Sequence, residues 1–165
     1  MRVLVLAVLL VAPAALAERS WTVEPGQALV TVDAAGASAF SHRMTGTLTE
    51  LDNKLVHLEL HLPLGSLTTG SVRRDERVPR EGEAVFDGVA EAREGRLLFV
   101  GTVQLHGVKR AVQLDVAVTR TEGMIYAHAT STLHLRDFGI DVAHDQARIE
   151  LDAGLRRRGV VAIRG

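Results

Sequence analysis

The sequence predicts a single all-β domain of about eight antiparallel strands. Three observations support this prediction. Apolar and polar residues alternate along most of the chain, which is the pattern of strands with one buried and one wet face. Turn-forming residues such as glycine and asparagine separate these runs at short intervals, as they do in hairpins. No helical period persists beyond two turns, and no repeat or linker divides the chain.

Residues 1–17 are expected to be a secretory signal peptide. Arg2 gives a positively charged start, an apolar run follows, and Ala15-Leu16-Ala17 has the small side chains of a cleavage site. Cleavage near Ala17 predicts a periplasmic or secreted protein. No other apolar run is long enough for a transmembrane segment. We expect the folded domain at residues 18–156 and a basic C-terminal tail at 157–165.

The strands are expected at about residues 20–24, 28–35, 44–52, 54–62, 96–106, 110–120, 123–135 and 147–156. The turn at His106-Gly107 joins two clearly alternating runs, and its glycine is suited to the positive φ of a hairpin turn. The one helical candidate is a short, charged segment near residues 72–90, which Pro79 and several glycines interrupt.

Such strands can bury their apolar faces in a two-sheet sandwich or in a closed barrel, and closure also removes exposed edges. Aromatic residues make up only 4% of the chain, so the interior is lined mainly by Val, Leu and Ala. These small groups either leave a cavity for a ligand or pack into a tight aliphatic core. The pattern alone does not decide between the two.

Charge and cysteine content restrict the possible partners. The chain has 19 Lys and Arg against 20 Asp and Glu, a net charge of −1, so the basic surplus of a nucleic-acid-binding protein is absent. There is no cysteine, and therefore neither a disulfide nor a thiol for lipid attachment. We predict no cofactor, and the sequence does not specify an oligomeric state.

Histidines offer two weak candidates for chemistry. His57, Glu59 and His61 alternate on one strand face, but the outer two lie about 13 Å apart, too far to share a metal ion easily. A solvated outer face is the favoured interpretation, and no metal site is predicted. His144-Asp145 is a plausible hydrogen-bonded pair, but no serine near it has a nucleophile-elbow pattern. No catalytic residue is predicted.

Four stretches in order resemble the YceI-like family of secreted, lipocalin-like proteins. "SWTVEP" is similar to that family's opening Trp-x-Val-Asp-Pro hairpin, with Glu24 in place of Asp. "GSLTTGSVRRD" resembles its segment leading to an Arg-Asp pair, here Arg74-Asp75. "VGTVQLHGVKRAVQL" resembles its strand–turn–strand signature, and "LHLRDFGI" its late Arg-x-x-Phe-Gly motif, one residue shorter. The resemblance covers about residues 20–155.

The resemblance implies an up-and-down antiparallel barrel around an apolar tunnel, and a non-catalytic binder or carrier of a lipid or isoprenoid-like amphiphile. The alternatives are an envelope structural or interaction barrel with a filled interior, or an enzyme acting on a lipid-like substrate. This chain departs from the family at residues 76–95, which are shorter and more charged and keep only Phe86 of the usual aromatic residues.

The expected ligand-binding residues combine inward positions of the strands with groups near the pocket entrance. Arg74, paired with Asp75, is expected to hold a polar head group there. The full set is Val32, Phe40, His42, Leu58, Leu60, Arg74, Phe86, Phe99, Leu114, Val116, Phe138 and Ile149.

Overall fold

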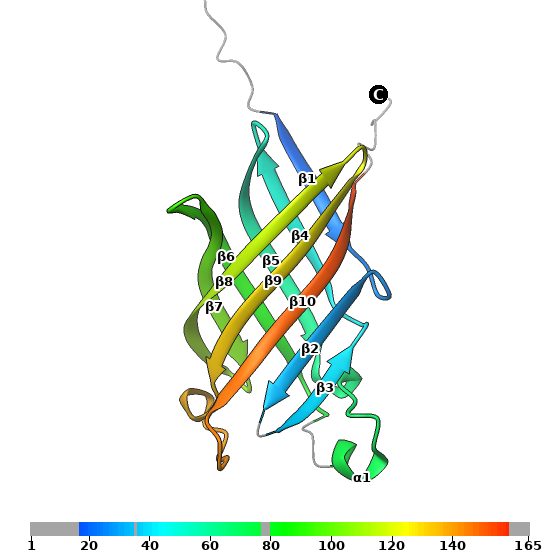
Figure 1. Cartoon of the computed structure of the whole chain (residues 1–165), viewed down its shortest axis with the longest axis vertical. Coiled ribbons are helices and arrows are strands. Elements are labelled where there is room, and N and C mark those ends of the chain that lie inside the picture. The colour runs from blue at the N-terminus through cyan, green and yellow to red at the C-terminus, as the bar shows by residue number, and fades with distance from the viewer. Residues whose placement is uncertain (1–16, 35, 77–79, 159–165) are drawn as a thin grey trace, which may run out of the picture.

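A computed structural model describes residues 17–34, 36–76 and 80–158, and it shows a closed antiparallel β-barrel (Figure 1). The expected signal peptide and basic tail fall almost entirely outside the described residues and stay predictions. The strands are β1 (Glu18–Val23), β2 (Ala28–Ala34), β3 (Ala37–Ser41), β4 (Thr45–Leu51), β5 (Lys54–Pro63), β6 (Glu83–Arg93), β7 (Arg96–Leu105), β8 (Val108–Thr121), β9 (Met124–His134) and β10 (Gln146–Arg157). The short helical elements are η1 (Leu64–Ser66), α1 (Val72–Asp75) and η2 (Leu135–Phe138).

The barrel closes through β10, which pairs with two successive strands of the chain's start. Strands β4 to β10 follow one another as an antiparallel meander. β10 then pairs with β2 along Ala147–Ala153 and with β1 at residues 156–157, while β1 also pairs with β4. β1 and β2 therefore act as two halves of one wall strand, and β3 and β4 do the same. This arrangement confirms the predicted eight-stranded barrel.

Tight hairpin turns join the strands where the sequence predicts them. His106 and Gly107 both have positive φ, 50° and 75°, and Glu94 and Gly95 have 51° and 76°. Two consecutive positive φ angles characterise the type I′ turn, whose twist matches that of the flanking strands. The predicted turn at Gly107 is confirmed, and His106 shares the left-handed conformation.

The prediction of a helical segment near 72–90 is right only for α1. Residues 83–93 form β6, a full strand of the barrel wall that the sequence analysis did not anticipate. Its inward positions carry Ala84, Phe86 and Gly88, while Val85 lies on the outer side, so no aliphatic stripe marks the strand. β3 was missed for the same reason, because its sequence ASAFS contains mostly small residues.

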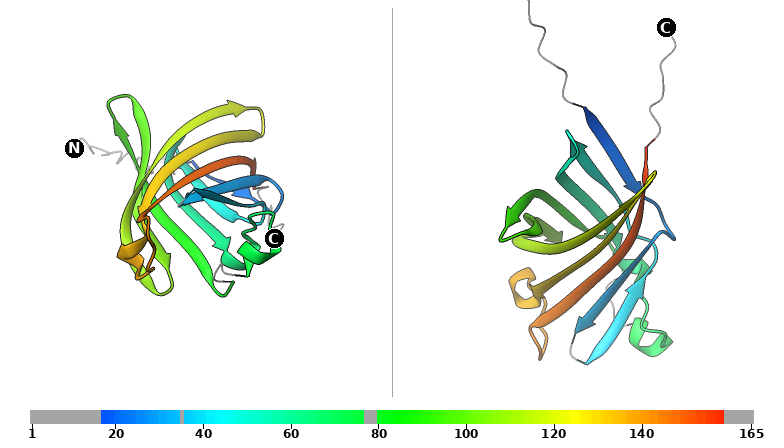
Figure 2. Two further views of the ribbon diagram at one scale, coloured as in Figure 1. Left: turned by 60° about the horizontal axis from the view of Figure 1, so that its bottom comes forward. Right: turned by 45° about the horizontal axis from the view of Figure 1, so that its top comes forward.

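The two ends of the barrel differ. The lower end in Figure 1 carries α1, η2, the end of β2 and the start of β3, whereas the upper end carries the start of β1 and the β8–β9 turn. Both views in Figure 2 show the strands tilted and coiled around one axis. Among the described residues, no helix has the length and apolar character needed to cross a bilayer.

Candidate ligand-binding cavity

The lower half of the barrel contains a hollow of about 110 Å³. It is surrounded mainly by inward side chains of strands that are distant in sequence, and Val85 and Thr130, at alternate positions, also contact it. Its lining consists of Val30, Val32, Met44, Leu60, Leu62, Ala84, Val85, Phe86, Val103, Val112, Leu114, Ala129, Thr130, Ser131, Leu133, Ile149 and Leu151. A site so dominated by aliphatic groups favours an apolar guest over water.

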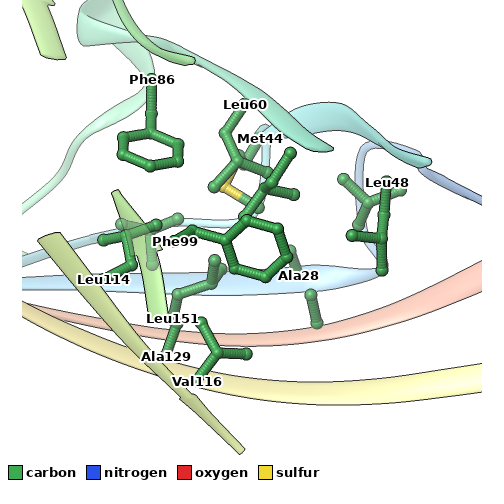
Figure 3. Close-up of a cluster of buried hydrophobic side chains, with 14 of the residues drawn as sticks. Ala28, Met44, Leu48, Leu60, Phe86, Phe99, Leu114, Val116, Ala129 and Leu151 are labelled. Carbon is green, nitrogen blue, oxygen red and sulfur yellow. The ribbon is translucent and has the colours of Figure 1, made fainter. Parts of the chain in front are cut away.

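The upper half of the barrel is packed almost solid. A space of about 20 Å³ lies there, lined by the Phe99 side chain, which is 1% exposed. Figure 3 shows the Phe99 ring at the centre of the buried cluster. Leu60, Ala129 and Leu151 line both spaces and so mark the boundary between the hollow and the packed half.

The cavity reaches the barrel wall between β8 and β9. The ladder between these strands ends at the pair Asp115–Thr130, although β8 starts at Val108 and β9 continues to His134. We call this unpaired stretch, residues 108–114 of β8 and 131–134 of β9, the β8–β9 seam. Cavity-lining residues on both of its sides, including Val112 and Leu133, are only half-buried, so the hollow is partly open there.

Ser131 is the polar residue of the seam that also lines the hollow. Its hydroxyl donates to the Gln113 carbonyl at 2.8 Å, a side-chain bond in place of the missing ladder. The Ser131 oxygen can still accept a hydrogen bond from a ligand hydroxyl. Ser131 and Thr130 are the polar residues of the lining, and no charged side chain lines the cavity in the described parts of the chain.

An ion cluster closes the upper end of the barrel. Glu50 of β4 is 0% exposed and occupies an inward position, where Arg19 of β1 donates to it at 3.1 Å. Arg120 donates to it from β8, which lies on the far side of the barrel in the strand order. Burial alone would raise the pKa of Glu50, but the hydrogen bonds and positive charges of Arg120 and Arg19 outweigh it and hold the pKa below its ordinary value.

We expect Glu50→Gln to destabilise the barrel by about 2 kcal/mol at neutral pH, the value of a charge-assisted hydrogen bond. A lowered carboxylate pKa stabilises the folded state above the unfolded-state pKa of about 4.5, and this stabilisation is lost as pH falls through the folded-state pKa. The difference between variant and parent in urea unfolding should therefore shrink on acidification. A difference that is constant between pH 7 and pH 3 would contradict this assignment.

The structure places the expected ligand residues in different environments. Five of them line the hollow: Val32, Leu60, Phe86, Leu114 and Ile149. Leu58, Phe99 and Val116 point inward into the packed upper half instead. Phe138 is buried in η2 at the lower end and belongs to the hydrophobic core without lining the hollow.

Phe40 and His42 do not point into the barrel, contrary to expectation. In the β2–β3 ladder Val30 is opposite Ser41, so the inward residues of β3 are Ser41 and its alternate neighbours, and Phe40 faces outward with 40% exposure. The His42 ring lies 6.3 Å from that of Phe40 and interacts with the Ala28 carbonyl on the outside of the wall. Because no strand was predicted over β3, its pairing with β2, which turns Phe40 outward, was not anticipated.

The expected ion pair between Arg74 and Asp75 is not formed. The Asp75 carboxylate accepts hydrogen bonds from the Thr68 hydroxyl and from the hydroxyl and backbone N–H of Thr69, at 2.6–2.7 Å. These bonds lower the pKa of Asp75 to about 2. Arg74 is exposed on α1 and is not part of the cavity lining. Asp75 therefore fixes the segment before α1.

Histidines of the outer face pair with carboxylates of the same or a neighbouring strand. His57 contacts Asp87 at 2.8 Å, and His61 bridges Glu59 and Glu83 at 2.6 and 3.0 Å. Hydrogen bonds to these two glutamates raise the pKa of His61. Within the described ranges, no group of three or more such side chains is placed to hold a metal ion.

Asp145 pairs with a different histidine from the one expected. Its carboxylate contacts His134 at 3.0 Å and accepts a hydrogen bond from the backbone N–H of Arg136 at 2.8 Å. The bond from the Arg136 backbone and that from His134 lower the pKa of Asp145. These contacts hold the loop after β9 in place, and the predicted His144–Asp145 pair is wrong.

The sequence did not reveal the lining residues of strands that lack an aliphatic stripe, such as Ala84, Ala129 and Ser131. β9 reads YAHATSTLH, in which small and polar residues occupy both faces, so neither face is marked as inward. The period of two, extended along β2 and β10, would have found two more lining residues. These are Val30, two positions before Val32, and Leu151, two positions after Ile149.

Comparison with known proteins agrees with this geometry. The family model of the YceI-like domain matches residues 21–155, nearly the whole of the barrel. The chain belongs to the YceI-like family. This family is generally associated with the binding of isoprenoid or lipid-like molecules, and its members are typically non-catalytic binders.

A solved structure shows the same YceI-like fold. BcnA of Burkholderia cenocepacia superimposes with a TM-score of 0.69, covering 83% of this chain and 99% of BcnA. The two sequences are only 11% identical, so the likeness establishes the fold alone. No curated protein matches the chain.

Proposed function

We propose that this YceI-like barrel is a non-catalytic binder or carrier of a small amphiphile, acting outside the cytoplasm. The observation that carries this proposal is the aliphatic hollow in the lower half of the barrel, which adjoins the β8–β9 seam. An apolar chain in the hollow leaves water, and each buried methylene contributes about 0.8 kcal/mol. The polar end of the ligand would lie at the seam, beside Ser131.

The absence of a catalytic constellation in the cavity lining supports a binding role over an enzymatic one. The lining contains no histidine, carboxylate or lysine among the described residues, and its two hydroxyl residues lack a neighbouring base in that set. The histidine–carboxylate pairs lie on the outer face, separated from the hollow by the wall. Their positions suit the stabilisation of strand pairing.

Native and denaturing mass spectrometry of the gently purified protein provide the direct test. A lipid or other amphiphile that is retained in the native spectrum and released by denaturation supports the carrier role. A barrel that is empty and also fails to bind added 1-hexanol would favour the structural alternative. Conversion of an added probe to a new product would favour an enzyme.

Ala84→Leu should weaken the binding of 1-hexanol at least tenfold. Ala84 lines the hollow from β6, and the added methylenes would occupy space that the alcohol chain needs. Ala117→Leu is the matched control, because Ala117 is exposed on the outer side of β8, where that strand is still paired with β9. Binding can be measured by NMR titration. Equal affinities for the two variants would place the alcohol outside the hollow.

A further inference from the structure

Phe99 lies at the upper boundary of the hollow, and this boundary limits how long a ligand chain the hollow can hold. In the β7–β8 ladder Phe99 is opposite Leu114. Leu114 lines the hollow, whereas Phe99 lines the residual space of the packed half. This one rung of the ladder therefore separates the two compartments.

We propose, building on the function proposed above, that Phe99 is the specificity-determining residue that limits the ligand to a short amphiphile with about five carbons in the barrel. A cavity of about 150 Å³ holds one benzene molecule, so a hollow of about 110 Å³ accommodates a somewhat smaller group. A longer chain would have to leave its remaining carbons in the seam or in solvent.

Aliphatic side chains pack around Phe99 in the upper half. The ring shares its residual space with Leu48 and Leu58 on one side of the barrel and Val116 and Leu155 on the other. Above this space, Trp21 and the buried Glu50 cluster fill the remaining interior. Leu60, Ala129 and Leu151 also lie at this boundary, but their side chains are smaller than the Phe99 ring.

The apolar lining also disfavours the entry of a charged head group into the hollow. A charged head that entered the cavity would lose its hydration without meeting an opposite charge, which is costly. Ser131 offers a hydroxyl oxygen that accepts a hydrogen bond from a neutral alcohol. An uncharged hydroxyl compound with a short apolar chain satisfies both the volume and the polarity of the site.

The test uses straight-chain 1-alcohols from four to twelve carbons on the full chain by NMR titration. In the parent, affinity should rise about fourfold with each carbon until about five or six carbons and then level off. In Phe99→Ala, the rise should continue for at least two further carbons, because removal of the ring joins the two spaces. Phe99→Leu, which removes less volume, should shift the plateau by a smaller amount and guards against failure of the alanine variant to fold.

Three outcomes would overturn the inference. An affinity that climbs without a plateau up to 1-dodecanol in the parent would show that Phe99 does not limit the chain, while the proposed binding function would stand. Identical plateaus in the parent and both Phe99 variants would have the same meaning. Binding of no alcohol at all by the folded parent would instead refute the binding function itself. Val89→Ala, at an exposed outer position of β6, should leave the plateau unchanged.

Discussion

Phe99→Ala should lower the free energy of unfolding by about 3–5 kcal/mol, the largest loss that we expect from one side chain of the barrel. The ring is 1% exposed and is surrounded by aliphatic groups of both walls. Its removal gives up the transfer free energy of the ring and leaves a void that rigid strands cannot fill. Urea unfolding followed by the fluorescence of Trp21, the single and buried tryptophan, measures the loss.

Phe40→Ala is the matched control for this prediction. It removes the same ring from β3, but there the ring lies on the outer face with 40% exposure. We expect a loss below about 1 kcal/mol, as for surface positions in general. Similar losses at Phe40 and Phe99 would indicate that the register of β3 differs from the one described here. Similar losses would also argue against the conclusion that the barrel has a packed half and a hollow half.

The stripes of strands β5, β8 and β10 were predictable because their aliphatic residues occur at every second position. Leu60, Leu114 and Ile149 were assigned inward from this pattern alone, and the structure places all three on the cavity lining. The period of two is a local property of an extended chain, so it can be recognised without knowing the partner strands. The same is true of the hairpin turn at His106-Gly107.

Phe40 shows where local pattern fails. In β3 the inward positions carry Ala39 and Ser41, and the large apolar residue faces solvent. The direction of Phe40 is set by the pairing of β3 with β2, and that register is not marked by any stripe in ASAFS. Hydrophobicity alone therefore points to the wrong face of this strand.

The limits of the cavity depend on residues that only barrel closure brings together. Arg19, Glu50 and Arg120 occupy inward positions at the upper end, where the pattern predicts apolar side chains. They are tolerated because each charge has a partner, and these partners come from strands far apart in sequence. The seam likewise depends on where the β8–β9 ladder ends. The residue pattern of the two strands does not indicate this position.

Gly101→Ala should cost about 3 kcal/mol, because the strands β6 and β7 approach each other too closely there for any side chain. Gly101 is opposite Gly88 in the ladder, and a Cβ on Gly101 would overlap the carbonyl oxygen of Asp87 and the Cα of Gly88. These are backbone atoms that cannot rotate away. The two strands would have to separate, with the loss of several ladder hydrogen bonds worth about 1 kcal/mol each.

Gly88→Ala is the informative comparison, because its new methyl group would meet the end of the Phe86 ring at 2.5 Å and the Val100 carbonyl oxygen at 3.1 Å. The ring can turn into the adjoining hollow, so we expect a smaller loss of about 1–2 kcal/mol. Since Phe86 lines the hollow, this variant should also weaken the binding of 1-hexanol. Chemical unfolding and NMR titration of the two glycine variants separate these effects. If Gly101→Ala lowers the free energy of unfolding no more than Gly88→Ala does, strands β6 and β7 can separate at little cost. The close approach of their backbones at Gly88 and Gly101 would then not be what positions Phe86 in the cavity lining.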